Sequence, residues 1–333
     1  MNLVTGATGL LGSHIVEKLR EQGHKVRVLV RRQSDTALLD SWGVEKAYGE
    51  LTDQASLAKA CQGVERVYHA AAQVGDWGKW EWFVASTIDG TRNLLTAARD
   101  AKVKRFLHIS SISTYGHPDG EGLVFDESAP AGVGLHRWSY YSRAKIEADR
   151  IAWEMHNKGD IPLTIVKPSW MYGPRDRASM PRMITAIRKG KAKIIGDGQN
   201  RLNLTYAGNE AEGCILAAMA NRAMGQTYNL SDDGAITLEE YWNGIAKALG
   251  AKPVTKKVPY KVAYTAGFLM ECMGHLLDRK KPPLVTRYSA WLMGRRCFFS
   301  CEKARRELGW QPTVGYDEGI RRSVQWCLDN NVC

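Results

Sequence analysis

A tyrosine and a lysine one helical turn apart could carry out acid–base chemistry in this chain. Tyr141 and Lys145 lie in a segment predicted to be helical, Ser139 to His156, and the i, i+4 spacing places both side chains on one face. A free tyrosine has a pKa of about 10. A neighbouring ammonium group favours the phenolate, so Lys145 is expected to lower the pKa of Tyr141 towards the neutral range. The pair predicts a group that exchanges a proton with a substrate oxygen.

A pair of serines could supply a hydroxyl beside that tyrosine. Ser110 and Ser111 end a predicted strand, Arg105 to Ser110, and ligands of parallel sheets sit at the carboxyl ends of the strands. The Ser111 hydroxyl can hydrogen-bond a substrate carbonyl next to Tyr141. The alternative is that the two serines only terminate the strand.

Three glycines near the N-terminus predict a dinucleotide site. A short apolar strand, Leu3 to Thr5, runs into a turn with Gly6, Gly9 and Gly12 and then into a periodic segment, Leu10 to Gln22. Gly6 permits a turn that a side chain would block, Gly9 lets backbone amides approach a pyrophosphate, and Gly12 lets the helix lie close to the strand. The start of the helix adds unpaired N–H groups and the positive end of its dipole.

Strands and helices alternate through the N-terminal two thirds of the chain, which predicts an α/β fold with a doubly wound parallel sheet. We expect a dinucleotide-binding (Rossmann) domain over residues 1–168. Residues 169–333 are expected to form mainly a smaller α/β substrate-binding lobe, with some elements returning to the sheet. The predicted strands after the first are His24–Val30, Val44–Tyr48, Arg66–Ala70, Arg105–Ser110 and Leu163–Lys167, and the long helix before the fifth strand is Thr87–Ala101.

The chain resembles the extended short-chain dehydrogenase/reductase family. The matching segments span nearly the whole sequence: the turn at 5–12, His69-Ala70-Ala71-Ala72, residues 90–93, Ser110-Ser111, Tyr141–Lys145, residues 167–174, residues 195–198 and residues 308–312. The resemblance implies that Ser111, Tyr141 and Lys145 are the catalytic residues of an oxidoreductase. Tyr141 would exchange the proton while a nicotinamide exchanges the hydride, and Lys145 would also hold the nicotinamide ribose.

Three positions depart from the family pattern. Thr87 stands where the family has an asparagine that helps to hold a water near the lysine. Glu50 replaces the usual aspartate near the adenine, and Lys167 replaces the usual arginine before Pro168.

Charge at the end of the second strand favours NADP(H) as the cofactor. Users of NAD tend to carry an acid there for the ribose 2′-hydroxyl, whereas this strand ends in Arg31 and Arg32. Two guanidinium groups suit a 2′-phosphate; arginines that are merely solvated are the alternative, and NAD(H) stays open. The predicted cofactor-binding residues are Gly6, Thr8, Gly9, Leu10, Leu11, Gly12, Arg31, Arg32, Glu50, Leu51, Ala70, Ala71, Ala72, Tyr141, Lys145, Pro168, Ser169 and Met171.

Tryptophans near the expected substrate site favour a bulky hydrophobic ligand. The segment 73–83 is rich in tryptophan, and two further tryptophans flank the catalytic segments; such rings bury large apolar areas, although each could simply be core. With residues 172–176 and 180–182, this segment resembles the 3β-hydroxysteroid dehydrogenase-like branch, which implies alcohol/ketone interconversion on a sterol or a long-chain β-keto acid. The alternatives are a nucleotide-sugar epimerase or dehydratase and a non-enzymatic NADP sensor. The predicted substrate-binding residues are Trp77, Trp80, Ser113, Trp138, Trp170 and Arg175.

The positive charge of the chain is concentrated in residues 251–301, where ten basic residues face two acidic ones within a total net charge of +11. A solvated basic face is one interpretation, and contact with an acidic membrane surface or with an anionic tail of the substrate is another; no nucleic-acid-binding motif is present. The apolar segment Val258–Leu277 is too interrupted to span a membrane. It could cover the substrate pocket or lie at a membrane interface.

The remaining features indicate an ordinary globular protein. Seven scattered cysteines form no CxxC pair, so free thiols in a reducing compartment and no metal site are expected. The sequence begins directly in a strand, so we expect no targeting peptide and a cytoplasmic protein, with membrane association left open. The resemblance also implies a homodimer.

Overall fold

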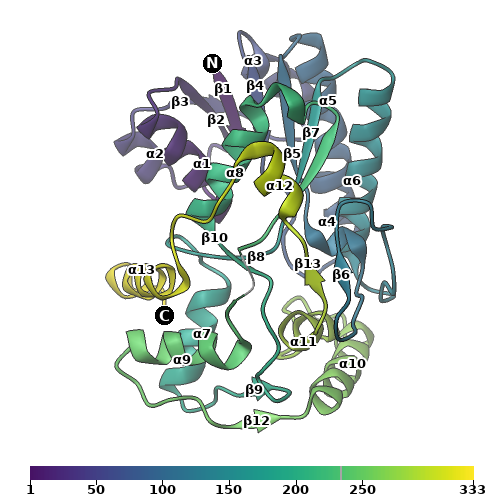
Figure 1. Cartoon of the computed structure of the whole chain (residues 1–333). Helices are drawn as coiled ribbons and strands as arrows, with labels where there is room; N and C mark the ends of the chain where they lie inside the picture. The colour runs from purple at the N-terminus through teal and green to yellow at the C-terminus, as the bar shows by residue number, and fades with distance from the viewer. Residues whose placement is uncertain (233–234) are drawn as a thin grey trace.

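A seven-stranded parallel sheet forms the centre of the protein (Figure 1), in a computed structural model that describes residues 1–232 and 235–333. The strand order is β11-β7-β5-β4-β1-β2-β3 and every pair is parallel. The order reverses between β1 and β4, which is where a doubly wound sheet binds its ligand. The predicted fold class is confirmed. The strands are β1 (Asn2–Thr5), β2 (Val26–Val30), β3 (Glu45–Tyr48), β4 (Arg66–His69), β5 (Arg105–Ile109), β7 (Leu163–Pro168) and β11 (Gln226–Leu230).

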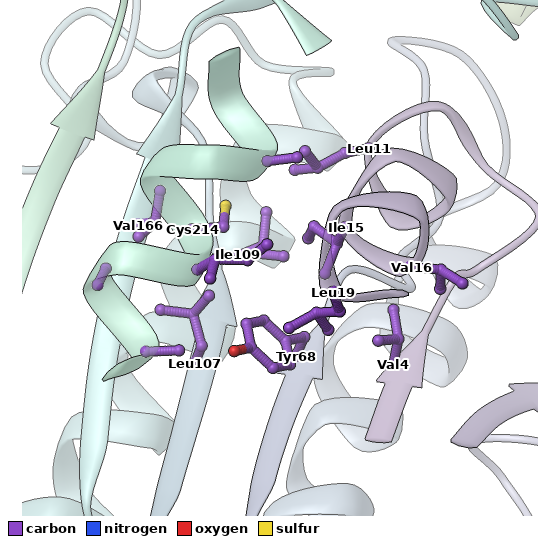
Figure 2. Close-up of a cluster of buried hydrophobic side chains, with 14 of the residues drawn as sticks. Val4, Leu11, Ile15, Val16, Leu19, Tyr68, Leu107, Ile109, Val166 and Cys214 are labelled. Atoms are coloured by element: carbon purple, nitrogen blue, oxygen red, sulfur yellow. The ribbon is translucent and has the colours of Figure 1, made fainter. Parts of the chain in front are cut away.

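Helices cover both faces of this sheet because its strands are apolar on both sides. On one face, α1 (Leu10–Glu21) and α8 (Ala207–Met219) pack together over side chains such as Val4 and Leu107 (Figure 2). On the other face, residues such as Leu3 and Phe106 pack against α3 (Gln54–Cys61), α5 (Gly90–Asp100) and α6 (Tyr140–Asn157). Buried strands of this kind are typical of parallel sheets.

The helical run before β5 begins earlier than predicted. The structure places α4 over Trp80–Phe83 and a π-helical segment over Val84–Asp89, which leads directly into α5. Trp80 and Phe83 pack on the apolar core between the sheet and helices α3, α5 and α6. The helix therefore buries apolar side chains at its start. The prediction that the helix begins at Thr87 was therefore wrong at this boundary.

Most of the rest of the chain packs around a second apolar core, whereas residues 301–310 pack on the core of the sheet. Thr237 and Glu240 form a capping box at the start of α9, in which the side chain of each accepts a hydrogen bond from the backbone amide of the other. The helices of this region are α7 (Ser179–Arg188), α9 (Leu238–Ala248), α10 (Tyr260–Leu276), α11 (Arg287–Gly294), α12 (Glu302–Leu308) and α13 (Tyr316–Asp329); short strand pairs are β8 (Trp170–Tyr172) with β10 (Leu204–Tyr206), β9 (Ile194–Ile195) with β12 (Lys257–Val258), and β6 (Val124–Phe125) with β13 (Phe298–Phe299).

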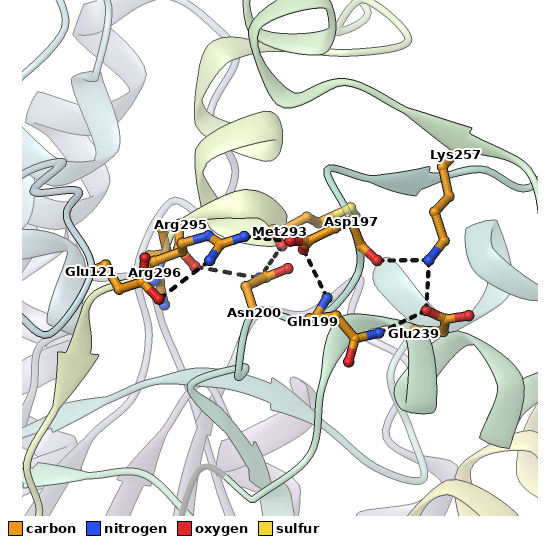
Figure 3. A network of polar contacts seen from close by, with 9 residues as sticks. All are labelled: Glu121, Asp197, Gln199, Asn200, Glu239, Lys257, Met293, Arg295 and Arg296. Carbon is orange, nitrogen blue, oxygen red and sulfur yellow. Dashed lines mark hydrogen bonds and ion pairs between the residues drawn. The ribbon is translucent and has the colours of Figure 1, made fainter.

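A polar network ties the outer elements of this region together (Figure 3). Lys257 donates to the Asp197 carbonyl at 2.7 Å and pairs with Glu239 at 2.8 Å. Arg296 forms an ion pair with Asp197, and Asn200 donates to the Met293 carbonyl at 2.7 Å. No helix in the described part of the chain is long and apolar enough to cross a membrane.

Candidate active site

The glycine turn after β1 has the close packing that a dinucleotide site needs. Gly6 has a φ of +68°, and a Cβ there would lie 2.8 Å from the Ala71 nitrogen. A Cβ on Gly12 would lie 2.2 Å from the Gly6 carbonyl oxygen. Both positions therefore require glycine. Gly9 begins α1 without a side-chain cap, so the first amides of the helix stay available to an anion.

Residues from three strand ends surround this turn. The hydroxyl of Thr5 accepts from the Ala71 amide at 3.2 Å, which holds Ala70–Ala72 against the turn. Pro168 ends β7, and Ser169 hydrogen-bonds Thr205 at 2.6 Å. The residues present therefore suit a nicotinamide dinucleotide: the turn would hold the pyrophosphate, and the ends of β4 and β7 would flank the remainder.

The residues expected to contact the adenosine half of the dinucleotide lie mostly on the exposed surface at the end of the sheet. Arg31 and Arg32 follow β2, are exposed, and have no ion pair within the described residues. Glu50 is exposed, whereas Leu51 is half-buried and its carbonyl accepts from Asn93 at 3.0 Å. Thr8 and Gly9 are exposed at the turn, with Leu10, Leu11 and Met171 more enclosed.

The structure brings Ser111, Tyr141 and Lys145 together. Tyr141 and Lys145 lie on α6, and Tyr141 hydrogen-bonds the side chain of Ser111, which begins a 3₁₀ turn after β5. Lys145 is buried and donates from Nζ to the Ile109 carbonyl at 2.7 Å. The strand end and the helix thus place a hydroxyl, a phenol and an amine at one edge of the sheet.

Burial decides the pKa of both ionisable groups. It raises the pKa of Tyr141, and the hydrogen bond to Ser111 opposes this rise. It lowers the pKa of Lys145 to about 8, and the negative charge of Asp149 opposes this fall. The expectation that Lys145 lowers the pKa of Tyr141 was wrong for this structure, because loss of water around the phenol outweighs the other influences.

Asp149 lies on α6 one further turn along from Lys145. Its carboxylate accepts from the Ser110 hydroxyl at 2.8 Å and lies 3.1 Å from the His108 Nε2 atom. His69, whose ring is 5.7 Å from that of His108, bonds Thr5 at 2.8 Å. A buried polar chain therefore runs from α6 to the strand that carries the glycine turn.

Tyr141 also forms part of the wall of a pocket. The rings of Trp77 and Trp138 lie on either side of His275, at centroid distances of 4.4 and 4.3 Å. The residues that line this pocket are Asp76, Trp77, His136, Trp138, Ser139, Tyr141, Ser142, Glu271, His275, Arg287 and Tyr288. Trp77 and Trp138, two of the predicted substrate-binding residues, thus lie beside Tyr141.

The other predicted substrate-binding residues lie away from this lining. Trp80 packs on Tyr140, at 5.6 Å between ring centroids, and Trp170 packs on Tyr241 at the same distance. Ser113 is buried in the 3₁₀ turn. Arg175 pairs with Glu17 at 2.6 Å, on the side of α1.

Several pocket residues carried no signal in the sequence. His136, Glu271, His275 and Tyr288 belong to no motif, and Arg287 stood out only as one member of a basic segment. Glu271 and Arg287 form an ion pair at 2.7 Å that joins α10 to α11. The inner side of α10 lines the pocket, in agreement with the expectation that Val258–Leu277 could cover it.

Thr87, the position that departs from the family asparagine, is buried in the π-helical segment. Its hydroxyl accepts from the Gln73 amide at 3.1 Å. The described residues contain no group of three or more His, Cys, Asp or Glu that could hold a metal ion.

Comparison with known proteins identifies the family. The model of the NAD dependent epimerase/dehydratase family matches residues 2–231. The chain belongs to this family. It is 32% identical over 327 residues to the 2-alkyl-3-oxoalkanoate reductase of Stenotrophomonas maltophilia (strain K279a), covering 96% of this chain and 97% of that protein. It is 29% identical to the decarboxylating sterol-4-alpha-carboxylate 3-dehydrogenase of Mus musculus, covering 97% of this chain and 89% of the relative.

A solved structure shows the same fold over the full length. The crystal structure of gox2253 superposes with a TM-score of 0.82 at 29% identity and covers 100% of this chain and 99% of that one. The resemblance to the extended short-chain dehydrogenase/reductases and to the 3β-hydroxysteroid dehydrogenase-like branch is thereby confirmed. The protein is an NAD(P)-dependent oxidoreductase that acts on a small molecule.

Proposed function

We propose that this oxidoreductase interconverts a secondary alcohol and a ketone on a bulky hydrophobic substrate, a sterol or a long-chain β-oxo or β-hydroxy acid, with NADP(H) as cofactor. The observation that carries the proposal is the position of Tyr141. It hydrogen-bonds Ser111 on one side and contributes to an aromatic pocket, with Trp77 and Trp138, on the other.

The residues have complementary roles in this reaction. Nicotinamide, when bound, supplies or accepts the hydride. In the reducing direction, Tyr141 donates its proton to the ketone oxygen, and Ser111 donates a hydrogen bond to the same oxygen and orients it. Burial keeps the pKa of Tyr141 high, so the phenol holds the proton that the reduction consumes. Lys145, through its ammonium form, holds the nicotinamide ribose.

The charges of the pocket favour this substrate class over a nucleotide sugar. Arg287 is the one lysine or arginine among the described lining residues, and Glu271 already pairs with it. Asp76 adds a further carboxylate. A diphosphate would therefore find no spare counter-ion, whereas rings and alkyl chains can pack on the tryptophans.

The named relatives point in the same direction. The bacterial relative is named for a 3-oxoalkanoate and the mouse relative for a sterol carboxylate that reacts at carbon 3. Both names describe largely hydrocarbon molecules with an oxygen at carbon 3. For the cofactor, Arg31 and Arg32 are exposed and form no ion pair with the described residues, which supports a contact to a 2′-phosphate.

A substrate panel with purified protein tests the proposal. Long-chain 3-oxo acids, 3-oxosteroids and their alcohols are assayed with NADPH, NADH and the oxidised cofactors, beside a set of nucleotide sugars. We expect turnover of at least one hydrophobic substrate and a lower KM for NADPH than for NADH. The variant R31A/R32A should raise the KM for NADPH and leave that for NADH unchanged. Turnover of nucleotide sugars alone would overturn the proposal.

A further inference from the structure

Helix α10 packs inward through its smallest residues. The buried positions of this 17-residue helix are Ala263, Gly267, Glu271 and Gly274, which follow one another at helical spacing. A Cβ on Gly267 would lie 2.8 Å from the Thr286 backbone, and one on Gly274 would lie 2.6 Å from the Trp77 ring. The helix is therefore pressed close against the pocket wall on this side.

The outward side of α10 and the segment after it are apolar. Leu269 is 57% exposed, Met273 53% and Leu276 85%. Among the described residues, eight of the seventeen exposed large hydrophobic ones lie between positions 262 and 284: Val262, Phe268, Leu269, Met270, Met273, Leu276, Leu277 and Leu284. A helix on the surface of a water-soluble protein normally turns its polar side to the solvent. An exposed apolar patch of this kind marks an interaction surface.

Free positive charge borders this apolar face. Lys261 at one end and Arg279, Lys280 and Lys281 at the other are exposed and have no ion pair among the described residues. Asp278 is the one exposed acid in this stretch. Other basic residues of the segment, such as Lys257 and Arg296, are occupied by ion pairs within the lobe (Figure 3).

We propose that α10 lies flat in the surface of an anionic phospholipid bilayer, with its apolar side among the acyl chains and the basic residues at the phosphate groups. Figure 1 places α10 at the outer edge of the molecule, at the end remote from the N-terminus. A helix of this length spans about 25 Å, which suits an in-plane position.

The opposite side of the same helix lines the candidate active site through Glu271 and His275. Docking would therefore bring the pocket beside the acyl chains, from which a hydrophobic substrate could enter. The entry of substrate from the bilayer rests on the proposed function, whereas the binding of α10 to the bilayer does not.

Vesicle flotation of the full-length protein tests the binding without an activity readout. The protein should float with vesicles of phosphatidylglycerol and phosphatidylcholine, less with phosphatidylcholine alone, and less as salt increases. M273D should lose binding, because it places a carboxylate in the acyl region. M224D is the matched control, since Met224 is 49% exposed on another surface, and it should bind as the unaltered protein does.

A second pair of variants tests the charge. K280E/K281E should weaken binding to anionic vesicles by roughly fivefold or more for each lysine, whereas K189E/K191E, at two exposed lysines of another surface, should change it little. Failure to float with anionic vesicles, or equal binding by M273D and M224D, would overturn the proposal. Light scattering that shows a dimer dissociated by M273D would also overturn it, because a second copy would then cover the face.

Activity on a short, water-soluble substrate separates this proposal from the proposed function. M273D should turn over such a substrate as the unaltered protein does. Flotation without any turnover of the panel would contradict the proposed function and leave the membrane proposal standing.

Discussion

Tyr141 and Tyr140 are neighbours in α6 with different surroundings. Tyr141 reaches the pocket and Ser111, whereas Tyr140 packs on Trp80 and Phe83 beneath the sheet. We expect Y141F to lower kcat by about 10²–10⁴-fold, the usual contribution of general acid–base catalysis. Y140F should leave kcat nearly unchanged. Steady-state assays on a substrate from the panel measure both, and equal effects of the two changes would argue against a proton-transfer role for Tyr141.

Asp149 provides a prediction about pH. Burial lowers the pKa of Lys145 to about 8, and the Asp149 charge raises it against that trend. If Lys145 acts as an ammonium ion, activity should fall as pH rises through about 8. In D149N this fall should occur at lower pH, because the stabilising charge is lost.

The pH profile of kcat/KM measures this shift. E147Q is the matched control, because Glu147 lies on the same helix but pairs with Arg150 at the surface. A D149N profile that coincides with the unaltered one would show that the Asp149 charge does not set the pKa of Lys145.

Site residues could be predicted from the sequence where a helix or a strand end fixes their positions relative to one another. Site residues that meet only through the fold could not be predicted. Tyr141 and Lys145 stood out because a helix fixes their separation, and Ser111 because it follows a strand. The raised pKa of Tyr141 could not be predicted, since it depends on the packing of distant segments around the phenol. Glu271 and Arg287 meet only through the fold, so neither carried a local signal.

At the scale of elements, the turn after β1 and helix α1 lie too close together to admit a side chain between them. A Cβ on Gly12 would lie 2.2 Å from the Gly6 oxygen, so G12A should force the helix away from the turn. We expect a loss of about 1–3 kcal/mol of stability and weaker NADPH binding. Urea unfolding and fluorescence titration measure the two effects. G315A, where no atom lies within 4 Å of the added Cβ, should change neither; a stable G12A that binds NADPH normally would show that the turn can relax.

Elements with a strong periodic pattern were predicted to within a few residues. Strands β1, β2, β4, β5 and β7 and helices α1 and α6 are long enough for their burial pattern to appear in the sequence. The two-residue strands β6, β9, β12 and β13 are too short to show alternation. They form because the packed lobe brings their partners together. The domain boundary at residue 168 and the homodimer stay predictions.

At the scale of the whole molecule, the buried histidines predict that the folded state loses stability in acid. Burial lowers the pKa of His14 to about 4, of His117 to about 3 and of His136 to about 4. It also lowers the pKa values of His69, His108 and His275. Below pH 6.5 the unfolded chain binds protons that the folded chain does not, so stability falls as pH falls towards about 4.

Each such proton costs about 1.4 kcal/mol per pH unit. Glu127 and Glu210 act in the opposite sense, since burial raises the pKa of each, but they are two groups against six. We expect the urea midpoint to be lower at pH 5 than at pH 7.5. H117F keeps a ring in the stack with His136 and should make the dependence shallower; a midpoint independent of pH would show that the fold opens around these histidines before it unfolds.

The pocket wall is assembled from two distant parts of the chain, residues 76–142 and residues 271–288. The first part belongs to the half that carries the glycine turn and Tyr141, and the second is contributed by α10 and α11. New ligand preferences can therefore arise, by natural drift or by design, through exchange of the later part while the machinery for hydride exchange is inherited intact.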